Sequence, residues 1–495
     1  MKRLLISSSF YRALEAIWAA VTMLIVTPIV IKALGAETYG LWLLILSSVG
    51  LLSFFELGFA SAIQRRMAQL IENNDLIRLN SIFSSAFFIF LILSIIAFTC
   101  VMLIAINPLV LGVSLNNQST VFNALFLLSI KLVFDFVANC FHGIFSGHLR
   151  FDIDSKVSIV AITIKAILMV MLVHNYGFIS LVLITLFVDI SVHIIKFIIA
   201  YRIQPSLTLS LPINFKDDLI DLTHYAKHVV FIELSRLIQD KSVTLFISHL
   251  FGLVTISIFS IADRLIRQAY SMIQTITGVL QPFLIRKLEK GELSQSLMQS
   301  SMLIHTWLCC VIFLPVMLCG PAFIILWVGS DFSESADLLH IFVLAFFLKV
   351  LVSPISHLLL AHAKHQKIAF LEITASIIYI TLLVILGNEF GLAGVVWGGV
   401  LASLLVHVFG YVFLAHKILG IKFTIGISII VKTQMIFWLT YFSNNYFELF
   451  SMEMTWLELV FSVFTCTLFS VLVGFYFILN KDLRRLLLFL ISEKN

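Results

Sequence analysis

Long apolar runs separated by short polar connections make up almost the whole chain. Each run has about 20 residues, the length at which an α-helix crosses roughly 30 Å of hydrocarbon. The runs are apolar on every side, whereas strands of a membrane barrel alternate apolar and polar residues. The pattern therefore predicts an all-α polytopic membrane protein with about fourteen transmembrane helices, over residues 13–32, 39–62, 82–106, 120–146, 157–173, 178–200, 225–250, 256–285, 298–320, 336–360, 367–386, 392–416, 425–443 and 456–479.

Basic residues gather in every second connection between these runs. They follow the even-numbered runs at Arg65, Arg66, Arg78, Arg150, Lys156, Arg202, Lys216, Lys227, Arg286, Lys287, Lys290, Lys364, Lys367, Lys417, Lys422, Lys481, Arg484 and Arg485. The connections between them, such as 107–119 and 329–337, contain no Lys or Arg, and Lys32 is the exception to the alternation. Because short loops rich in Lys and Arg stay in the cytoplasm, the pattern predicts a multi-pass protein of the bacterial cell inner membrane with both termini cytoplasmic.

Composition agrees with this picture and excludes several classes of function. Only 12% of the 495 residues are charged, against roughly 25% in soluble proteins, so no sizeable water-facing domain is expected. The net charge of +5 comes from basic residues at cytoplasmic edges, where membrane lipids and not nucleic acid are the expected partners. The six cysteines lie in apolar runs without metal-ligand spacing, and the sequence has no phosphate-binding loop or nucleophile elbow. We therefore expect no cofactor, no metal, no catalytic site and no enzymatic activity, and any transport must use a gradient.

Internal similarity divides the chain. The longest cytoplasmic connection, about 201–224, follows the sixth run and suggests a boundary there. Three residues reappear about 214 positions later, with Asn175, Gly177 and His193 matching Asn388, Gly391 and His407. We therefore predict a six-helix bundle over 1–205, a second six-helix bundle that repeats it over 206–420, and two extra helices with a cytoplasmic tail over 421–495.

Several predicted helices carry charged residues at bilayer depth, while the runs 82–106 and 298–320 carry none. Lys131 and Asp135 are four residues apart, as are Arg236 and Asp240, and Asp263 and Arg267, so each pair lies on one helix face. Two interpretations remain open: these are structural pairs that neutralise each other during insertion, or they face a shared hydrated cavity. Glu56, Lys165 and Arg264 have no opposite charge one turn away that would favour the first interpretation.

Two stretches of the sequence carry a family resemblance. Residues 34–42 read Leu-Gly-Ala-Glu-Thr-Tyr-Gly-Leu-Trp and are followed by Gly50-Leu51 and Glu56-Leu57-Gly58. Their order resembles the start of the O-antigen flippase (Wzx-type) group within the multidrug/oligosaccharidyl-lipid/polysaccharide exporter superfamily. The second half is similar to the family from Phe251-Gly252 to Gln281-Pro282-Phe283, although Ile256 stands where the family has tyrosine.

The resemblance implies two six-helix bundles around a central cationic cavity, and a flippase for an undecaprenyl-diphosphate-linked oligosaccharide, the O-antigen repeat unit. A polyprenyl-diphosphate-linked glycan is then the substrate, and polysaccharide polymerase and chain-length machinery are expected partners. The candidates for binding the substrate are the basic residues Lys131, Lys165, Arg236, Lys241, Arg264 and Arg267. The candidates for ion or proton coupling are Glu56, Asp135, Asp189, Asp240 and Asp263. Glu56, Arg264 and Arg267 also match the helices on which the family places cavity charges.

Three alternatives stay open at this point. A drug/cation antiporter of the same superfamily should have an acidic cavity, whereas basic and acidic residues are nearly balanced in these runs. A flippase for a cell-wall lipid precursor is a closer relative of the same kind. A membrane-bound O-antigen polymerase or ligase belongs to a different class and needs a substantial external loop with catalytic basic residues, which the short external connections lack.

Overall fold

The computed structural model consists of helices joined by short connections in the residues it describes, which are 2–56, 58–114, 117–211, 215–277, 295–361, 365–420, 454–479 and the isolated positions 428, 431, 435 and 438. By length and apolar composition, eight helices in this described part are suited to crossing a membrane: Ser7–Phe55, Leu76–Ile106, Gln118–Gly147, Phe151–Ile203, Gln299–Val328, Ser330–Leu359, Gln366–Ile418 and Trp456–Ile478. The prediction of an all-α polytopic membrane protein is therefore confirmed, and the predicted span 425–443 lies outside the described residues apart from the isolated positions.

Three of the long helices each contain two arms joined at a glycine. Helix α5 (Phe151–Ile203) has 53 residues, about 80 Å at 1.5 Å per residue, which is more than twice the thickness of a bilayer core. Gly177 interrupts it with φ 58° and ψ −146°, a conformation that only glycine adopts readily. Gly35 in α1 (Lys2–Leu51) and Gly391 in α13 (His365–Ala402) have the same role. Each of these helices thus supplies two predicted spans.

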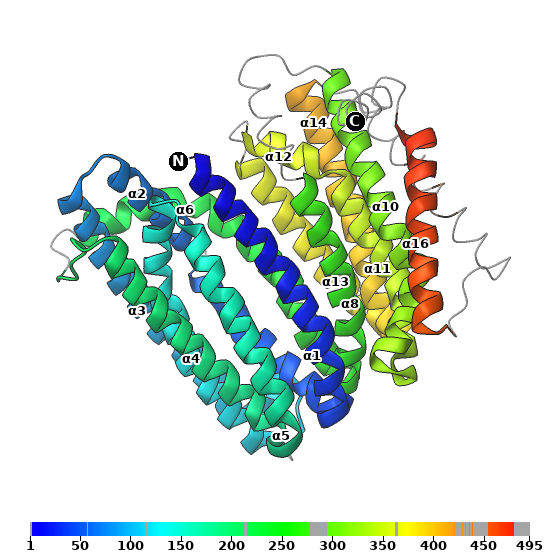
Figure 1. Ribbon diagram of the computed structural model, residues 1–495, viewed down its shortest axis with the longest axis horizontal. Coiled ribbons are helices and arrows are strands. Elements are labelled where there is room, and N and C mark those ends of the chain that lie inside the picture. Colours follow the sequence, from blue (N-terminus) through cyan, green and yellow to red (C-terminus); the bar gives the residue numbers. More distant parts are fainter. Residues whose placement is uncertain are drawn as a thin grey trace. The chain divides into compact units, whose positions relative to one another are not determined.

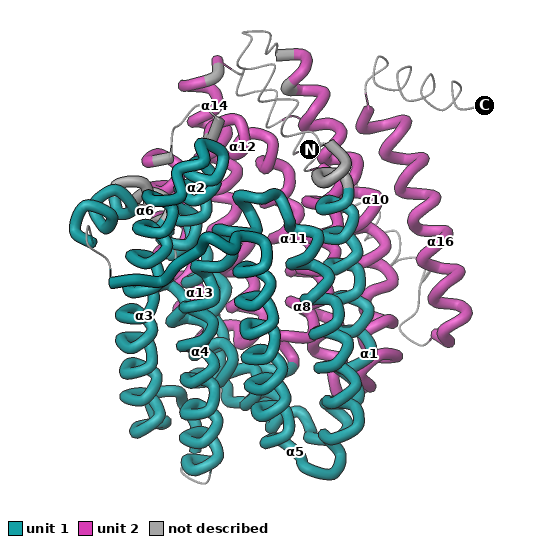
Figure 2. The backbone as a smooth tube through the Cα atoms, turned by 60° about the vertical axis from the view of Figure 1, so that its left-hand side comes forward, with its two compact units in different colours: residues 1–257 teal, residues 258–495 magenta. Residues whose placement is uncertain are grey.

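The chain forms two compact units, Met1–Ser257 and Ile258–Asn495, coloured separately in Figure 2. The first unit contains α1, α5 and the following shorter elements: η1 (Leu52–Phe55), α2 (Phe59–Glu72), α3 (Leu76–Ile106), η2 (Pro108–Leu111), α4 (Gln118–Gly147), α6 (Phe215–Leu237), η4 (Ile238–Ser242) and α7 (Val243–Phe251). Helix α4 packs against α2, α3 and α5, and α1 packs along α5 (Figure 1). The aromatic side chains Phe83, Phe90, Phe136 and Phe145 are fully buried in this core.

The second predicted span is broken where the sequence suggests one continuous helix over 39–62. The 3₁₀ turn η1 ends at Phe55 with Glu56 as its C-cap, and α2 starts after Gly58, which has φ 79°. Positive φ is available to glycine without a steric penalty, so Gly58 permits the break. The break leaves the Glu56 side chain at the junction between the two segments.

The start of α6 is fixed to α2 and α3 within the first unit. The buried Asp218 carboxylate lies 2.9 Å from the Arg78 guanidinium and accepts hydrogen bonds from Ser81 at 3.0 Å and Ser85 at 2.6 Å. Arg66 of α2 pairs with the more exposed Asp221 at 3.1 Å. These contacts explain why α6 groups with the helices before it. The predicted repeat boundary at 205/206 follows the sequence pattern and stays a prediction.

The second unit starts within α8 (Leu253–Thr277) and contains α10 (Gln295–Val328), η5 (Ser330–Phe332), α11 (Ser333–Leu351), α12 (Ser353–Ala361), α13, η6 (Ser403–Gly410), α14 (Tyr411–Leu419), α16 (Trp456–Val473) and η7 (Gly474–Ile478). Helix α10 packs against α11 on one side and α16 on another (Figure 1). The Trp307 indole donates to the Val471 carbonyl at 3.3 Å, while Leu457, Phe461 and Phe477 of α16 and η7 are largely exposed. An apolar exposed face of this kind suits contact with lipid.

Candidate functional site

Two facing stripes of polar side chains meet between α4 and α5. Lys131, Asp135 and Asn139 follow one another at intervals of one turn along α4, so they share a face. Asp189, His193 and Lys196 form a similar stripe on the second arm of α5, residues 178–203. The tertiary fold brings the two stripes into contact and adds Lys165 from the first arm, residues 151–176.

The lysines and aspartates of these stripes form a connected set of ion pairs. Lys131 Nζ lies 2.6 Å from Asp135 Oδ2 and 3.4 Å from Asp189 Oδ2. Lys165 Nζ lies 2.6 Å from the other oxygen, Asp189 Oδ1. We call Lys131, Asp135, Lys165 and Asp189 the four-residue charge network. It confirms the in-helix pair of Lys131 with Asp135 and corrects the interpretation of Lys165, which gains a partner from the neighbouring arm.

Two further side chains extend the network. His193 Nε2 lies 2.7 Å from Asp135 Oδ1. The amide of Asn139 donates to Glu56 Oε2 at 2.6 Å, which ties the break in the second span to α4. Glu56 therefore has a partner that charge spacing alone could not reveal, because Asn139 is neutral and 83 positions away.

The network is neither fully buried nor fully exposed. Its four members and His193 keep between 18% and 27% of their side-chain surface accessible. Two lysines face two aspartates, so the set is neutral overall while the histidine is neutral. Ammonium groups at partly exposed positions can exchange a carboxylate for another anion, since the new contact is again a charge-assisted hydrogen bond.

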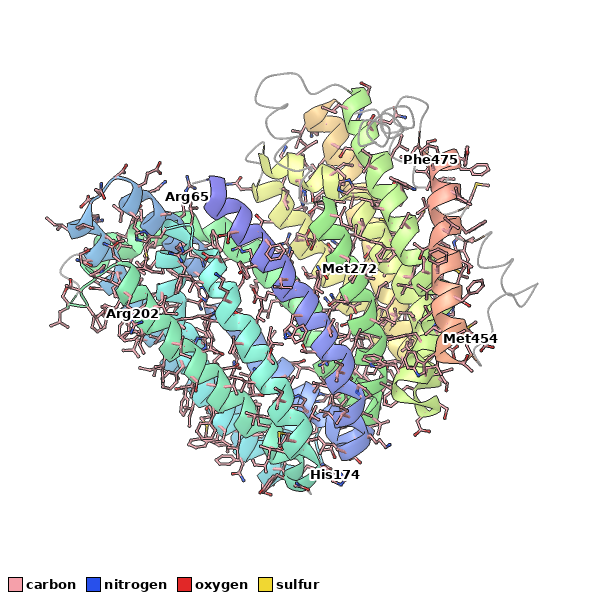
Figure 3. All side chains as sticks on the ribbon, in the orientation of Figure 1. Arg65, His174, Arg202, Met272, Met454 and Phe475 are labelled. Atoms are coloured by element: carbon pink, nitrogen blue, oxygen red, sulfur yellow. The ribbon has the colours of Figure 1, made fainter. Side chains whose placement is uncertain are left out.

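A second group of charges lies nearer the start of α5. Lys196 Nζ is 2.8 Å from Asp154 Oδ1, and His142 Nδ1 is 3.7 Å from Asp154 Oδ2. At the first turn, Asp152 accepts a hydrogen bond from Arg150 at 3.1 Å. Asp154 was not among the predicted site residues, because it lies before the predicted span 157–173. Arg65 and Arg202 lie toward the same end of this unit's helices, and His174 lies at the opposite end (Figure 3).

The predicted site residues of α6 and η4 do not form the ion pair that their spacing in the sequence suggests. Arg236 pairs with Glu233 at 3.1 Å instead of with Asp240, four residues later. The α-helical spacing does not apply here, because the chain changes to a π-helix over Ile238–Ser242. Single π turns of this kind often mark functional sites. Lys241 in this turn points at α1, where its Nζ lies 3.9 Å from the place a Gly50 Cβ would occupy.

In the second unit, the predicted pair on α8 is present. Arg267 Nε donates to Asp263 Oδ2 at 2.6 Å. The Arg267 guanidinium carbon and Lys349 Nζ lie 5.6 Å and 5.5 Å from the centre of the Phe346 ring, close enough for cation–π attraction. Arg264 on the same helix is partly buried.

A buried acidic group in the second unit was not among the predicted site residues. Glu372 of α13 accepts a hydrogen bond from Tyr411 at 2.7 Å and lies 3.6 Å from His407 Nε2. His407 belongs to the π-helix η6. The sequence repeat could have pointed to this group of side chains, since His407 corresponds in sequence to His193. Among the described residues, no group of three or more His, Cys, Asp and Glu side chains is arranged to hold a metal ion.

Comparisons with known proteins agree with this architecture. Residues 6–288 match the family model described as "Polysaccharide biosynthesis protein". No curated protein matches the chain by sequence. Among solved structures, the chain is similar to the lipid II flippase MurJ in an inward closed conformation, with a TM-score of 0.73, 14% identity, and coverage of 95% of this chain and 99% of that chain.

Two structures of a multidrug resistance MATE family transporter are also similar. The inward-facing one has a TM-score of 0.63 and 16% identity, covering 81% of this chain and 98% of that chain. The outward-facing one has a TM-score of 0.58 and 14% identity, covering 85% and 96%. At these identities the likeness concerns the fold, whereas the family match extends over more than half of the sequence. The chain therefore belongs to the polysaccharide biosynthesis protein family.

Proposed function

We propose that the protein is a flippase that moves an undecaprenyl-diphosphate-linked oligosaccharide, the O-antigen repeat unit, from the cytoplasmic to the periplasmic leaflet of the bacterial inner membrane. Membership of the polysaccharide biosynthesis family supports export of a glycan intermediate. The likeness of the fold to a lipid II flippase supports a lipid-linked substrate. Polysaccharide polymerase and chain-length machinery are the proposed partners on the product side.

The observation that carries this proposal is the four-residue charge network. A lipid diphosphate headgroup has about two negative charges and many hydroxyl groups, which cannot cross hydrocarbon unaided. Lys131 and Lys165 are two ammonium groups that both contact the Asp189 carboxylate, so they are close enough to hold the two phosphates of one headgroup. Their partial exposure makes them reachable without unfolding the bundle.

We propose fourteen spans in two six-helix bundles that face a central cavity, with two additional helices at the C-terminal end. The two arms in each of α1, α5 and α13 support this number. Rocking of the bundles would expose the cavity alternately to the two sides. An inside-negative membrane favours expulsion of the anionic headgroup by about 2.3 kcal/mol per charge for each 100 mV.

The charge network argues against the alternative of a drug/cation antiporter. A site for an organic cation should be acidic overall, whereas the network balances two aspartates with two lysines. The likeness of the fold to a lipid II flippase favours a flippase over the polymerase or ligase alternative.

The test uses the full-length protein in neutral-lipid vesicles that contain an undecaprenyl-diphosphate-linked sugar with a fluorescent label on the sugar. A reductant that cannot cross the membrane bleaches only the label on the outer leaflet. With a membrane potential imposed, we expect the protein to change the bleached fraction for this lipid and not for labelled phosphatidylcholine. Lys131→Met should abolish this change, while Lys156→Met, a lysine at the start of α5, serves as the matched control. Transport of an organic cation without movement of the labelled lipid would contradict the proposal.

A further inference from the structure

The lysines proposed to hold the substrate are already neutralised by aspartates of the same bundle. We infer that Asp135 and Asp189 are internal counter-ions, which the substrate diphosphate displaces from Lys131 and Lys165 on loading and which displace the diphosphate again on release. This inference rests on the proposed function. It gives these two carboxylates a role different from the ion or proton coupling that the sequence suggested.

The geometry makes the exchange local. The Asp189 carboxylate is divided between the two lysines, with one oxygen 3.4 Å from Lys131 and the other 2.6 Å from Lys165. A diphosphate also offers separate oxygens to two ammonium groups, so it can replace the Asp189 carboxylate as the bridge. Asp135 keeps a donor after it loses Lys131, because His193 Nε2 lies 2.7 Å away.

The exchange of counter-ions also limits the affinity of the carrier for its substrate, so that the substrate can be released. An ammonium group left without a counter-ion inside a protein is costly. The aspartates remove this cost in the empty carrier, so the diphosphate gains only the difference between two charge-assisted contacts. Release at the far side is therefore assisted by carboxylates that stay within a few ångströms of the lysines.

The net charge of the network differs between the loaded and the empty carrier. Two lysines and two aspartates sum to zero, so the empty network moves no net charge when the carrier returns. The loaded network carries the charge of the headgroup. The membrane potential then acts on the loaded step alone, in the direction that expels the headgroup from a negative-inside cell.

The inference makes a prediction that a purely structural pair would not. Replacing either aspartate by asparagine removes the competing charge with almost no change in shape. The diphosphate should then bind more tightly while its release slows, so the half-saturating substrate concentration and the maximal rate both fall. A structural pair would instead lose binding and rate together as the bundle loosens.

The experiment measures binding of undecaprenyl diphosphate to the full-length protein in neutral-lipid nanodiscs, with undecaprenol as the uncharged control. Asp135→Asn and Asp189→Asn are compared with Asp154→Asn, which removes an aspartate paired with Lys196 outside the four-residue network. The same variants are assayed for transport of the labelled sugar lipid in vesicles. A symmetric elution profile and an unchanged unfolding temperature establish that each variant is folded. Because Asp135→Asn and Asp189→Asn are independent substitutions, the test still works if one of the two variants fails to fold.

We expect each network variant to bind undecaprenyl diphosphate about tenfold more tightly, the effect of one hydrogen bond to a charged group, with a lower maximal transport rate. Asp154→Asn should resemble the wild type. Unchanged or weaker binding in folded Asp135→Asn and Asp189→Asn, while the wild type still transports, would overturn the inference and leave the proposed function standing. A wild type that neither binds the diphosphate nor moves the labelled lipid would overturn both.

Discussion

Gly177 and Gly391 lie about 214 positions apart and have almost the same backbone conformation, with φ 58° and ψ −146° at the first and φ 62° and ψ −146° at the second. Each joins two arms of a long helix. A match in both dihedral angles at corresponding positions supports the sequence repeat, because neither conformation is one that the neighbouring helical residues adopt. The repeat boundaries themselves stay a prediction.

Alanine at Gly177 or Gly391 should destabilise the protein. An added Cβ would meet nothing within 4 Å at either site, so the penalty is one of backbone conformation alone, about 1–3 kcal/mol. The apparent unfolding temperature in detergent should fall for both variants. Gly399→Ala is the matched control, because its Cβ would make an ordinary contact 3.4 Å from the Tyr379 ring within a helix, and it should leave the temperature unchanged or raise it. Equal effects at all three glycines would contradict this explanation.

Arg267→Ala should reduce transport by about tenfold or more, the expected effect of losing a charge-assisted contact, without lowering the amount of protein. Arg267→Lys should be intermediate, because lysine keeps the charge but lacks the planar group that pairs with Asp263 and faces Phe346. The vesicle assay with labelled sugar lipid measures both, and Arg202→Ala at the end of α5 is the control. Wild-type transport by Arg267→Ala would remove this arginine from the site.

Glu56→Gln separates charge from hydrogen bonding at the break in the second span. A glutamine oxygen can still accept from Asn139, which now donates to Glu56 at 2.6 Å, but the negative charge is gone. If Glu56 couples transport to an ion or proton, Glu56→Gln should slow transport and flatten its dependence on pH, whereas Asn139→Leu should slow it and keep that dependence. A Glu56→Gln rate equal to that of the wild type at every pH would rule out coupling through this residue.

Asp218→Asn should strongly destabilise the first unit. Its carboxylate is fully buried and holds Arg78 with two serines, and breaking a buried ion pair costs about 3–5 kcal/mol. Asp221→Asn is the control, since the pair of Asp221 with Arg66 has side chains 45% and 37% exposed, and such pairs contribute about 0–1 kcal/mol. The unfolding temperatures of the two variants should differ clearly. Similar losses would mean that burial of Asp218 does not decide its contribution.

Cysteines placed in two connections of the first unit test the proposed orientation. Asn74 lies between α2 and α3, and Ser119 lies at the start of α4. In a chain without its native cysteines, a membrane-impermeant thiol reagent added to whole cells should label Ser119→Cys and leave Asn74→Cys unlabelled until the cells are opened. The reverse result would invert the topology derived from the basic connections.

The helices and one kind of pairing could be predicted from the sequence. Hydrophobic length predicts spans because every backbone group in a bilayer must be satisfied within the helix. Spacing of four residues predicts that Lys131 meets Asp135 and that Asp263 meets Arg267, and both contacts are present. Such predictions succeed because the partners belong to one rigid helix.

Contacts between helices could not be predicted in this way. Lys165 contacts Asp189 across the two arms of α5, and Lys196 contacts Asp154. The tertiary fold decides which sides of the helices pack together. Arg236 contacts Glu233 because the helical period changes to a π turn just after it. The break at Gly58 was missed for a similar reason, since a single glycine in an apolar run is compatible with a continuous helix as well as an interrupted one.

The contact between Lys165 and Asp189 also affects how the chain enters the bilayer during synthesis. A lone lysine at the centre of a helix opposes insertion by about 2.5–3.5 kcal/mol, and the first arm of α5 contains Lys165 with no acidic residue one turn away. Its counter-charge is made only after Gly177, on the second arm. The two arms are therefore expected to leave the translocation machinery as one helical hairpin, and Gly177 is the turn that lets the second arm bring the neutralising carboxylate to the first.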